Sequence, residues 1–275
     1  MKKNILIIGK RSFVSLNLFL NLQHKQNIKI LSYKKFLSLS LSYIKNFDYL
    51  INCSINKKYI KNKYSQKNDF DFKIAKKIES LNTKMIFLSS RKVYKNKYNL
   101  KESDPVNPKC NYSKNKLISE NILKKILNKR VLILRISNLI GPHIKNENKL
   151  HKTFIDIFFE NIKKGIIIKN NSCYKDFLSI KKFCQIINNL IKKNTYGIYN
   201  VSIGKKIYLK EIVAWLNYYN NKEYKCMKFA KFSNNDSFTL NNHKLMKQIN
   251  ITNGIQELKK DCKMISKKFF KGKYK

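Results

Sequence analysis

Tyr112 and Lys116 are four residues apart in a stretch with helical periodicity, so their side chains share one face of the expected helix. A lysine ammonium one turn from a phenol favours the ionised phenol, which suits such a pair to general acid/base chemistry. Ser90 ends an apolar run upstream, and its hydroxyl can hydrogen-bond the same substrate oxygen. The spacing alone is unspecific in a lysine-rich chain, because four pairs share it: Tyr59/Lys63, Tyr112/Lys116, Tyr218/Lys222 and Tyr224/Lys228.

A turn that could bind a dinucleotide follows the first apolar run, residues 4–8. Gly9, Ser12 and Ser15 stand where the pattern G-x-x-G-x-x-G places its glycines, between a strand and a helix N-terminus that holds pyrophosphate. Serine is small enough for the third position, where helix and strand pack closely. At the second position it adds a Cβ, although its hydroxyl can donate to a phosphate. An ordinary strand-to-helix turn stays open as the alternative.

The end of the second apolar run bears on which dinucleotide would bind. No acidic residue stands there to accept a hydrogen bond from a ribose 2′-hydroxyl, whereas Lys34 and Lys35 can neutralise a 2′-phosphate. The sequence therefore favours NADP slightly over NAD.

Short apolar runs alternate with helix-like stretches along the first half of the chain. The runs cover residues 4–8, 28–31, 49–52, 85–88 and 131–136, and the helix-like stretches cover residues 12–22, 72–78 and 112–127. This alternation predicts an α/β fold, a Rossmann-type doubly wound parallel sheet with a smaller C-terminal lobe. Residues 1–142 would form the dinucleotide-binding core, and residues 143–275 mostly the substrate-binding lobe, with some elements returning to the core. Such sheets bind ligands beyond the carboxyl ends of their strands, so functional residues are expected just after each run.

The surroundings of Ser90 and Tyr112 resemble those in one family, the extended short-chain dehydrogenase/reductases, which include NAD(P)-dependent nucleotide-sugar epimerases, dehydratases and reductases. The family motif S-S-x-x-V-Y matches residues 89–94. Its segment with E-x-D/N-P, N-P, Y-x-x-S/N-K and E matches residues 102–120, and its L-R-x-x-N-x-x-G-P matches residues 134–142. All three prolines of the chain lie in these segments.

The resemblance implies a role for each matched residue. Tyr112 would be the general acid/base on a sugar hydroxyl or ketone, Lys116 would favour its ionised form and hold the nicotinamide ribose, and Ser90 would orient the substrate oxygen. The expected cofactor-binding residues are Gly9, Ser12, Phe13, Val14, Lys34, Cys53, Ser54, Tyr112 and Lys116, and the expected substrate-binding residues are Ser89, Arg91 and Asn138. Arg135 is expected to form a structural ion pair instead.

Two departures from the family motifs narrow the choice among dehydratase, epimerase and reductase. The dehydratases carry an Asp-Glu pair after the strand-end hydroxyl, where this chain has Arg91 and Lys92, so no acid stands ready for the elimination of water. The stretch between the second run and Asp48 is too short for the extra strand and D-x-x-D segment of many epimerases, and it resembles the dTDP-4-dehydrorhamnose reductase branch. The expected function is reduction of a 4-keto sugar nucleotide for surface polysaccharide synthesis, with a nucleotide-sugar 4-epimerase as the alternative.

A third alternative is a degenerate, non-catalytic scaffold that binds RNA or another anionic partner. The missing glycines allow it, as does the sequence at residues 180–182, where the family usually has acidic residues. The net charge of +43, from 59 Lys+Arg against 16 Asp+Glu, points the same way. Only four of the basic residues are arginine, however, and the lysines are spread along the whole chain. Abundant Lys, Asn, Ile, Phe and Tyr are typical of an AT-rich coding sequence, so the charge argues only weakly for nucleic acid.

Several further expectations concern partners and surroundings. The six cysteines lack C-x-x-C spacing, and the histidines show no ligand spacing with them, which predicts reduced thiols and no metal. No apolar run approaches the length of a membrane span, and the N-terminal run is too short for a signal peptide, so a cytoplasmic protein is expected. The family resemblance implies a homodimer.

Overall fold

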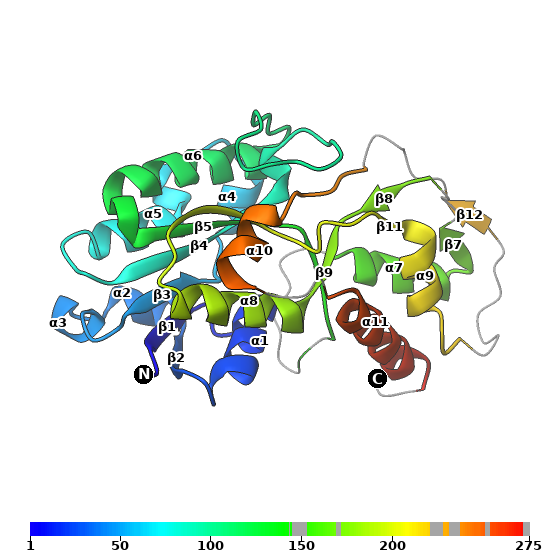
Figure 1. Ribbon diagram of the computed structural model, residues 1–275, viewed down its shortest axis with the longest axis horizontal. Helices are drawn as coiled ribbons and strands as arrows, with labels where there is room; N and C mark the ends of the chain where they lie inside the picture. Colours follow the sequence, from blue (N-terminus) through cyan, green and yellow to red (C-terminus); the bar gives the residue numbers. More distant parts are fainter. Residues whose placement is uncertain are drawn as a thin grey trace.

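A six-stranded parallel sheet with the order β10-β5-β4-β3-β1-β2 forms the centre of the larger lobe in the computed structural model (Figure 1). Its strands are β1 (Asn4–Ile8), β2 (Asn27–Leu31), β3 (Tyr49–Asn52), β4 (Lys84–Ser90), β5 (Val131–Ile136) and β10 (Gly197–Val201). The structure describes residues 1–142, 144, 153–168, 172–220, 228–230, 237–250 and 254–271. Because β2 and β3 flank β1 on opposite sides, the strand order switches at β1, where a doubly wound sheet opens a crevice beyond its carboxyl ends.

Helices cover both faces of this sheet. One face carries α1 (Phe13–Leu22) and α8 (Ile180–Lys192), and the other carries α4 (Lys57–Lys61), α5 (Phe70–Lys77) and α6 (Asn111–Leu127). Successive residues of β1 serve the two faces in turn, because side chains alternate along a strand. Ile5 and Ile7 pack with the α1 and α8 side, whereas Leu6 and Ile8 pack with α5 and α6, and all four are fully buried. The sheet therefore has a separate apolar core on each face.

The connections near the site are short. Only α2 (Tyr33–Leu37) and α3 (Leu41–Ile44) lie between β2 and β3. Three single helical turns also occur here. Of these, η1 (Gln66–Asn68) precedes α5, η2 (Arg91–Val93) follows β4, and η3 (Asn128–Arg130) precedes β5. Within the described residues, β2 is the last strand at this edge of the sheet.

The smaller lobe consists of helices and pairs of short strands (Figure 1). Its helices are α7 (Phe154–Lys163), α9 (Leu209–Leu216) and α11 (Ile255–Phe270), while α10 (His243–Ile249) packs against β10 and α8. The strand pairs are β6 (Asn138–Ile140) with β9 (Phe177–Ser179), β7 (Ile166–Ile168) with β12 (Lys228–Ala230), and β8 (Tyr174–Lys175) with β11 (Ile207–Tyr208). None of the described helices is both long and apolar enough to cross a membrane.

The predicted α/β fold with a doubly wound parallel sheet is confirmed. One finding was not expected in detail: residues 197–201 form β10, which pairs with β5 in the main sheet. That pairing joins residues far apart in the sequence, so local patterning could not show it. The boundary at residue 142 stays a prediction, and His143, His151 and Cys226 lie outside the described residues.

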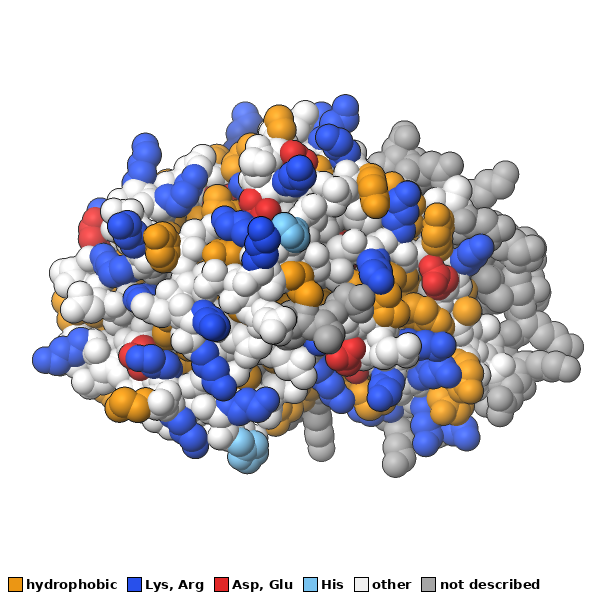
Figure 2. All heavy atoms as spheres, in the orientation of Figure 1, with side chains coloured by type: hydrophobic (Ala, Val, Ile, Leu, Met, Phe, Trp, Pro, Cys, Tyr) orange, Lys and Arg blue, Asp and Glu red, His pale blue; other side chains and the backbone are white. Residues whose placement is uncertain are grey.

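The lysines are distributed rather than gathered on the face visible in Figure 2. Lys and Arg side chains lie over both lobes there and alternate with uncharged side chains. The described residues on this face form no single basic patch of the kind that tracks a nucleic-acid backbone.

Candidate active site

The turn expected to hold pyrophosphate lies at the switch point of the sheet. Gly9 follows β1 with φ +112°, and a Cβ built there would lie 2.9 Å from the backbone carbon of Cys53 and 2.9 Å from the backbone nitrogen of Ser54. Any side chain would clash with the segment that follows β3, so this position requires glycine. The turns after β1 and β3 are thereby packed against each other at the carboxyl edge.

The two serines in the later glycine positions have defined contacts. Ser12 is the N-cap of α1, and its hydroxyl accepts a hydrogen bond from the backbone N–H of Ser15 at 3.1 Å. Ser15 is fully buried, and its hydroxyl donates to the carbonyl oxygen of Gly9. A glycine at the third position usually lets the helix approach the strand closely. Here the Ser15 side chain occupies that space, and its hydroxyl is hydrogen-bonded to Gly9. Phe13 and Val14 occupy the first turn of α1, where backbone N–H groups lack helical partners.

The segment after β3 is ordered by an asparagine at the strand end. The Asn52 side-chain oxygen accepts from the backbone N–H of Ser54 at 3.0 Å and from its hydroxyl at 2.7 Å. Burial raises the pKa of the Cys53 thiol well above its usual range, so Cys53 is held as a neutral thiol beside the turn. Both residues expected to line the cofactor thus lie next to Gly9.

The expected catalytic residues come from β4 and α6, which pack against each other. Ser90 ends β4 and caps η2, with its hydroxyl accepting from the backbone N–H of Lys92 at 3.2 Å. Tyr112 lies in the first turn of α6 and is partly exposed, and Lys116 lies one turn later on the same face and is buried. Since η2 also packs against α6, the end of β4 with Ser90 lies beside the helix that carries Tyr112 and Lys116.

A buried carboxylate faces Lys116 from α5. Asp71 Oδ2 lies 3.5 Å from the Lys116 Nζ, and Asn52 donates to Asp71 Oδ1 at 2.8 Å. Burial raises the pKa of Asp71 to about 6, while the neighbouring Lys116 ammonium acts to lower it. Burial acts to lower the pKa of Lys116, but the charges of Asp71 and Tyr112 oppose it, and the balance is a raised value. The pair is therefore charged at neutral pH.

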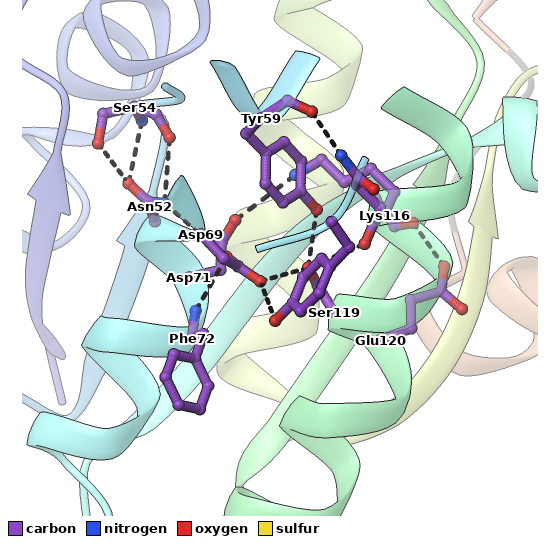
Figure 3. Close-up of polar contacts among 12 residues, drawn as sticks. Asn52, Ser54, Tyr59, Asp69, Asp71, Phe72, Lys116, Ser119 and Glu120 are labelled. Atoms are coloured by element: carbon purple, nitrogen blue, oxygen red, sulfur yellow. Dashed lines mark hydrogen bonds and ion pairs between the residues drawn. The ribbon is translucent and has the colours of Figure 1, made fainter. Parts of the chain in front are cut away.

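A second carboxylate, Asp69, belongs to the same cluster (Figure 3). Asp69 is fully buried and caps α5 by accepting from the backbone N–H of Phe72 at 3.0 Å. Its other oxygen accepts from the hydroxyl of Ser119 at 2.6 Å and from that of Tyr64 at 3.1 Å. Ser119 in turn lies 2.7 Å from the hydroxyl of Tyr59. The cluster links α4, α5 and α6 behind the expected site.

Ser89 does not share the position of Ser90. It is buried, and its hydroxyl donates to Glu120, because adjacent residues of a strand point to opposite faces. Arg135 completes that network with a 2.7 Å contact from its Nη2 to Glu120 and a 2.8 Å hydrogen bond from its Nη1 to the Tyr94 hydroxyl. The expected structural ion pair of Arg135 is confirmed.

The other expected ligand-binding residues have different surroundings. The Arg91 guanidinium stacks on the ring of Phe238, 3.8 Å from its centroid, and so connects η2 with the smaller lobe. Asn138 donates through its side chain to the carbonyl oxygen of Asp176 at 3.3 Å, beside the pairing of β6 with β9. Lys34 is exposed on α2, near the carboxyl end of β2.

Asp176 itself joins two segments of the smaller lobe. Its carboxylate accepts from the backbone N–H groups of Ile203, Gly204 and Leu240 at 3.1–3.2 Å. Burial nevertheless raises the pKa of Asp176 to about 7, against the lowering effect of these donors.

The comparisons with known proteins agree with this geometry. The family model for the NAD dependent epimerase/dehydratase family matches residues 43–202. The chain belongs to this family. It is accordingly an enzyme of the extended short-chain dehydrogenase/reductase type.

Solved structures of low sequence identity share the fold. The UDP-N-acetylglucosamine 4-epimerase from Methanobrevibacter ruminantium M1, in complex with UDP-N-acetylmuramic acid, is 20% identical, with a TM-score of 0.80 over 98% of this chain and 99% of that one. The dTDP-glucose 4,6-dehydratase from Bacillus anthracis, in complex with NAD, is 16% identical, with a TM-score of 0.77 over 98% and 97%. RMD from Pseudomonas aeruginosa, complexed with NADPH, is 16% identical, with a TM-score of 0.76 over 98% and 99%. No curated protein matches the chain in sequence.

Sequence reasoning missed the carboxylates behind the site. Asp69 and Asp71 were not singled out, although a chain with 16 acidic residues against 59 basic ones makes each acid informative. Asn200 was also missed as a junction: it is fully buried, accepts from the Tyr94 hydroxyl at 3.0 Å and donates its backbone N–H to Glu102 at 2.8 Å. Only the pattern around Asp69, an acid followed by a helix, offered a local signal.

Proposed function

We propose that this protein is an NAD(P)-dependent reductase of a 4-keto sugar nucleotide, as in surface polysaccharide synthesis. The observation that carries the proposal is the set Ser90, Tyr112 and Lys116 at the carboxyl edge of the sheet, followed after Ser90 by Arg91 and Lys92. A hydroxyl, a phenol and an ammonium suit proton transfer to a ketone, whereas elimination of water would need an acid at the cationic positions.

The turn at the switch point fits a dinucleotide. Gly9 keeps the turn free of a side chain, and α1 presents the unpaired N–H groups of its first turn and the positive end of its dipole to an anion. A bound nicotinamide would supply the hydride for reduction. Cys53 and Ser54 would line its site, and Lys34, exposed at the end of β2, supports the preference for NADP over NAD.

The residues around the carbonyl carbon would divide the proton chemistry. Ser90 would hold the ketone oxygen through its hydroxyl, and Tyr112 would donate the proton that this oxygen needs as the alcohol forms. Lys116, charged and on the same face of α6, would stabilise the phenolate that Tyr112 leaves behind. Asn138 and Arg91 would bind the sugar nucleotide from the side of the smaller lobe.

The short connection between β2 and β3 supports the dTDP-4-dehydrorhamnose reductase-like branch. Only α2 and α3 occupy residues 32–48, so the additional strand of many epimerases has no place there. We further propose a homodimer and a cytoplasmic location.

The test is turnover by the purified protein. Loss of reduced-cofactor absorbance is followed with NADPH and with NADH across a panel of 4-keto sugar nucleotides, with Tyr112→Phe as the matched control. We expect turnover that Tyr112→Phe reduces by about 10²–10⁴-fold while dinucleotide affinity is retained. No turnover on any panel member refutes the reductase, and conversion of a sugar nucleotide to its C4 epimer without net cofactor oxidation assigns the 4-epimerase instead. RNA binding with a steep salt dependence, together with no dinucleotide binding, assigns the non-catalytic scaffold.

A further inference from the structure

Lys116 and Asp71 form a buried ion pair directly behind the expected catalytic tyrosine. Their side chains are 7% and 6% exposed, and their charged atoms lie 3.5 Å apart. Figure 3 shows the lysine reaching from α6 towards the start of α5, where Asp71 lies. A pair this deeply buried keeps both charges only because each offsets the desolvation of the other.

Asp71 is fixed from its other side by the segment that would line the cofactor. Asn52 donates to Asp71 Oδ1 at 2.8 Å and donates through the same nitrogen to the carbonyl oxygen of Ser54 at 3.1 Å. The Asn52 oxygen is used by the N–H and hydroxyl of Ser54. The carboxylate therefore has one oxygen held by β3 and the other turned to Lys116.

The remaining surroundings of the ammonium cannot replace a carboxylate. The Lys116 Nζ lies 4.4 Å from the centroid of the Phe87 ring and 5.6 Å from that of Tyr59. Aromatic faces attract a cation more weakly than an adjacent anion does. The titratable groups facing the pair from the packed elements are Tyr33, Cys53, Tyr59, Tyr64, Asp69 and Tyr112. Of these, only Asp69 is a second carboxylate, and its oxygens are taken by Phe72, Tyr64 and Ser119.

We propose that Asp71 is a positioning residue of the active site, which keeps Lys116 charged and holds its ammonium on the face of α6 that carries Tyr112. The inference rests on the function proposed above, since it assigns Asp71 to the support of the same lysine. Asp71 touches neither the substrate nor the cofactor in this role and acts through Lys116. Without it, burial favours loss of the proton from Lys116, and the lysine becomes neutral at a pH where the wild type is still charged.

A double-mutant cycle tests the ion pair without any ligand. Asp71→Asn, Lys116→Met and the double variant are compared by thermal unfolding at about pH 8. Asp71→Asn should lower the melting temperature of the wild type, because it leaves a buried ammonium without a counter-charge. In the Lys116→Met background the same change should raise the melting temperature, because it removes an unpaired carboxylate. If Asp71→Asn changes the melting temperature by the same amount and in the same direction in both backgrounds, the proposed ion pair is refuted.

Dinucleotide affinity against pH tests the role of the pair. NADPH binding is followed by fluorescence from about pH 6 to pH 10, with Asp261→Asn as the matched control. Asp261 is a buried aspartate on α11 whose carboxylate accepts from Ser179 at 2.6 Å. We expect Asp71→Asn to lose about tenfold more affinity at pH 9 than at pH 6, relative to wild type. Asp261→Asn should follow the wild type, and the loss should be absent in the Lys116→Met background.

The outcomes separate this inference from the proposed function. A wild-type profile for Asp71→Asn, or an equal loss in the Lys116→Met background, overturns the inference. The expected profiles together with no turnover of any keto sugar support Asp71 as the partner of Lys116 and refute the reductase alone. A wild type that binds no dinucleotide overturns both. If Asp71→Asn does not fold, the wild type decides. Dinucleotide affinity that falls as the pH rises, and is lost before about pH 9, means that Lys116 titrates as an unpartnered amine, which overturns the inference.

Discussion

Replacing Arg135 by methionine should destabilise the fold strongly, because it leaves Glu120 charged in the core. Glu120 is fully buried, and Arg135 reaches it from Nε at 3.2 Å to each oxygen and from Nη2 at 2.7 Å. After the substitution, the carboxylate keeps the neutral hydroxyl of Ser89 as a partner. Breaking a buried ion pair from one side costs about 3–5 kcal/mol, because a desolvated charge is left without compensation.

Removing both charges should be milder than removing one. In Arg135→Met/Glu120→Leu neither charge of this ion pair remains, and apolar replacements of buried ion pairs are often neutral or stabilising by about 1–4 kcal/mol. The hydroxyls of Ser89 and Tyr94 each lose a partner in the double variant, at about 1 kcal/mol each. We therefore expect the double variant to recover about half or more of the loss.

The assay is urea unfolding followed by circular dichroism, supported by melting temperatures. A loss of about 3–5 kcal/mol corresponds to a decrease of about 6–20 °C in the melting temperature. Lys76→Met is the control, because its ion pair with Glu79 is about half exposed, and such a pair contributes at most about 1 kcal/mol. The reasoning is refuted if Arg135→Met costs no more than this control, or if the double variant is as unstable as the sum of the single ones.

Three further predictions follow from the site and its supports. Gly9→Ala should destabilise the protein by about 1–3 kcal/mol and abolish dinucleotide binding, because the new Cβ meets the backbone of Cys53. An NADPH affinity equal to that of the wild type in a fluorescence titration would contradict this. Lys34→Ala should weaken NADPH by a few-fold, by the loss of about 1 kcal/mol or less at an exposed phosphate contact, and leave NADH unchanged in parallel titrations. The raised pKa of Asp176, about 7, means that the folded state binds this proton more tightly than the unfolded state. The free energy of unfolding should therefore fall as the pH rises from about 4 to about 7, by at most about 1.4 kcal/mol per pH unit from this group. Asp176→Asn should flatten that part of the slope in urea unfolding at several pH values, and parallel slopes for wild type and variant would rule it out.

Local patterning predicted most of the sheet and the order of its elements. The predicted runs at residues 4–8, 49–52 and 131–136 coincide with β1, β3 and β5. Each is a short run of β-branched and other apolar residues that is buried on both faces, a signal that depends on neighbours in sequence. The prediction of the family followed from motifs that are themselves local.

The structure separates Ser89 from Ser90 for a reason already present in the sequence. Ser89 and Ser90 are consecutive in β4, so their side chains must point to opposite faces. The expectation that both contact the substrate did not take this alternation into account. The structure directs Ser89 to Glu120, whereas Ser90 caps η2.

The sequence by itself determined the fold class, the family and the residues from which a site could be built, because each of these depends on short-range pattern. Tertiary structure alone decided which charges meet. Asp71 pairs with Lys116 across 45 positions and Glu120 with Arg135 across 15, and a lysine-rich chain offers each acid many cations at similar distances in sequence. The buried partner is selected by which helix packs on which strand, since only there does desolvation make the pairing of two charges matter.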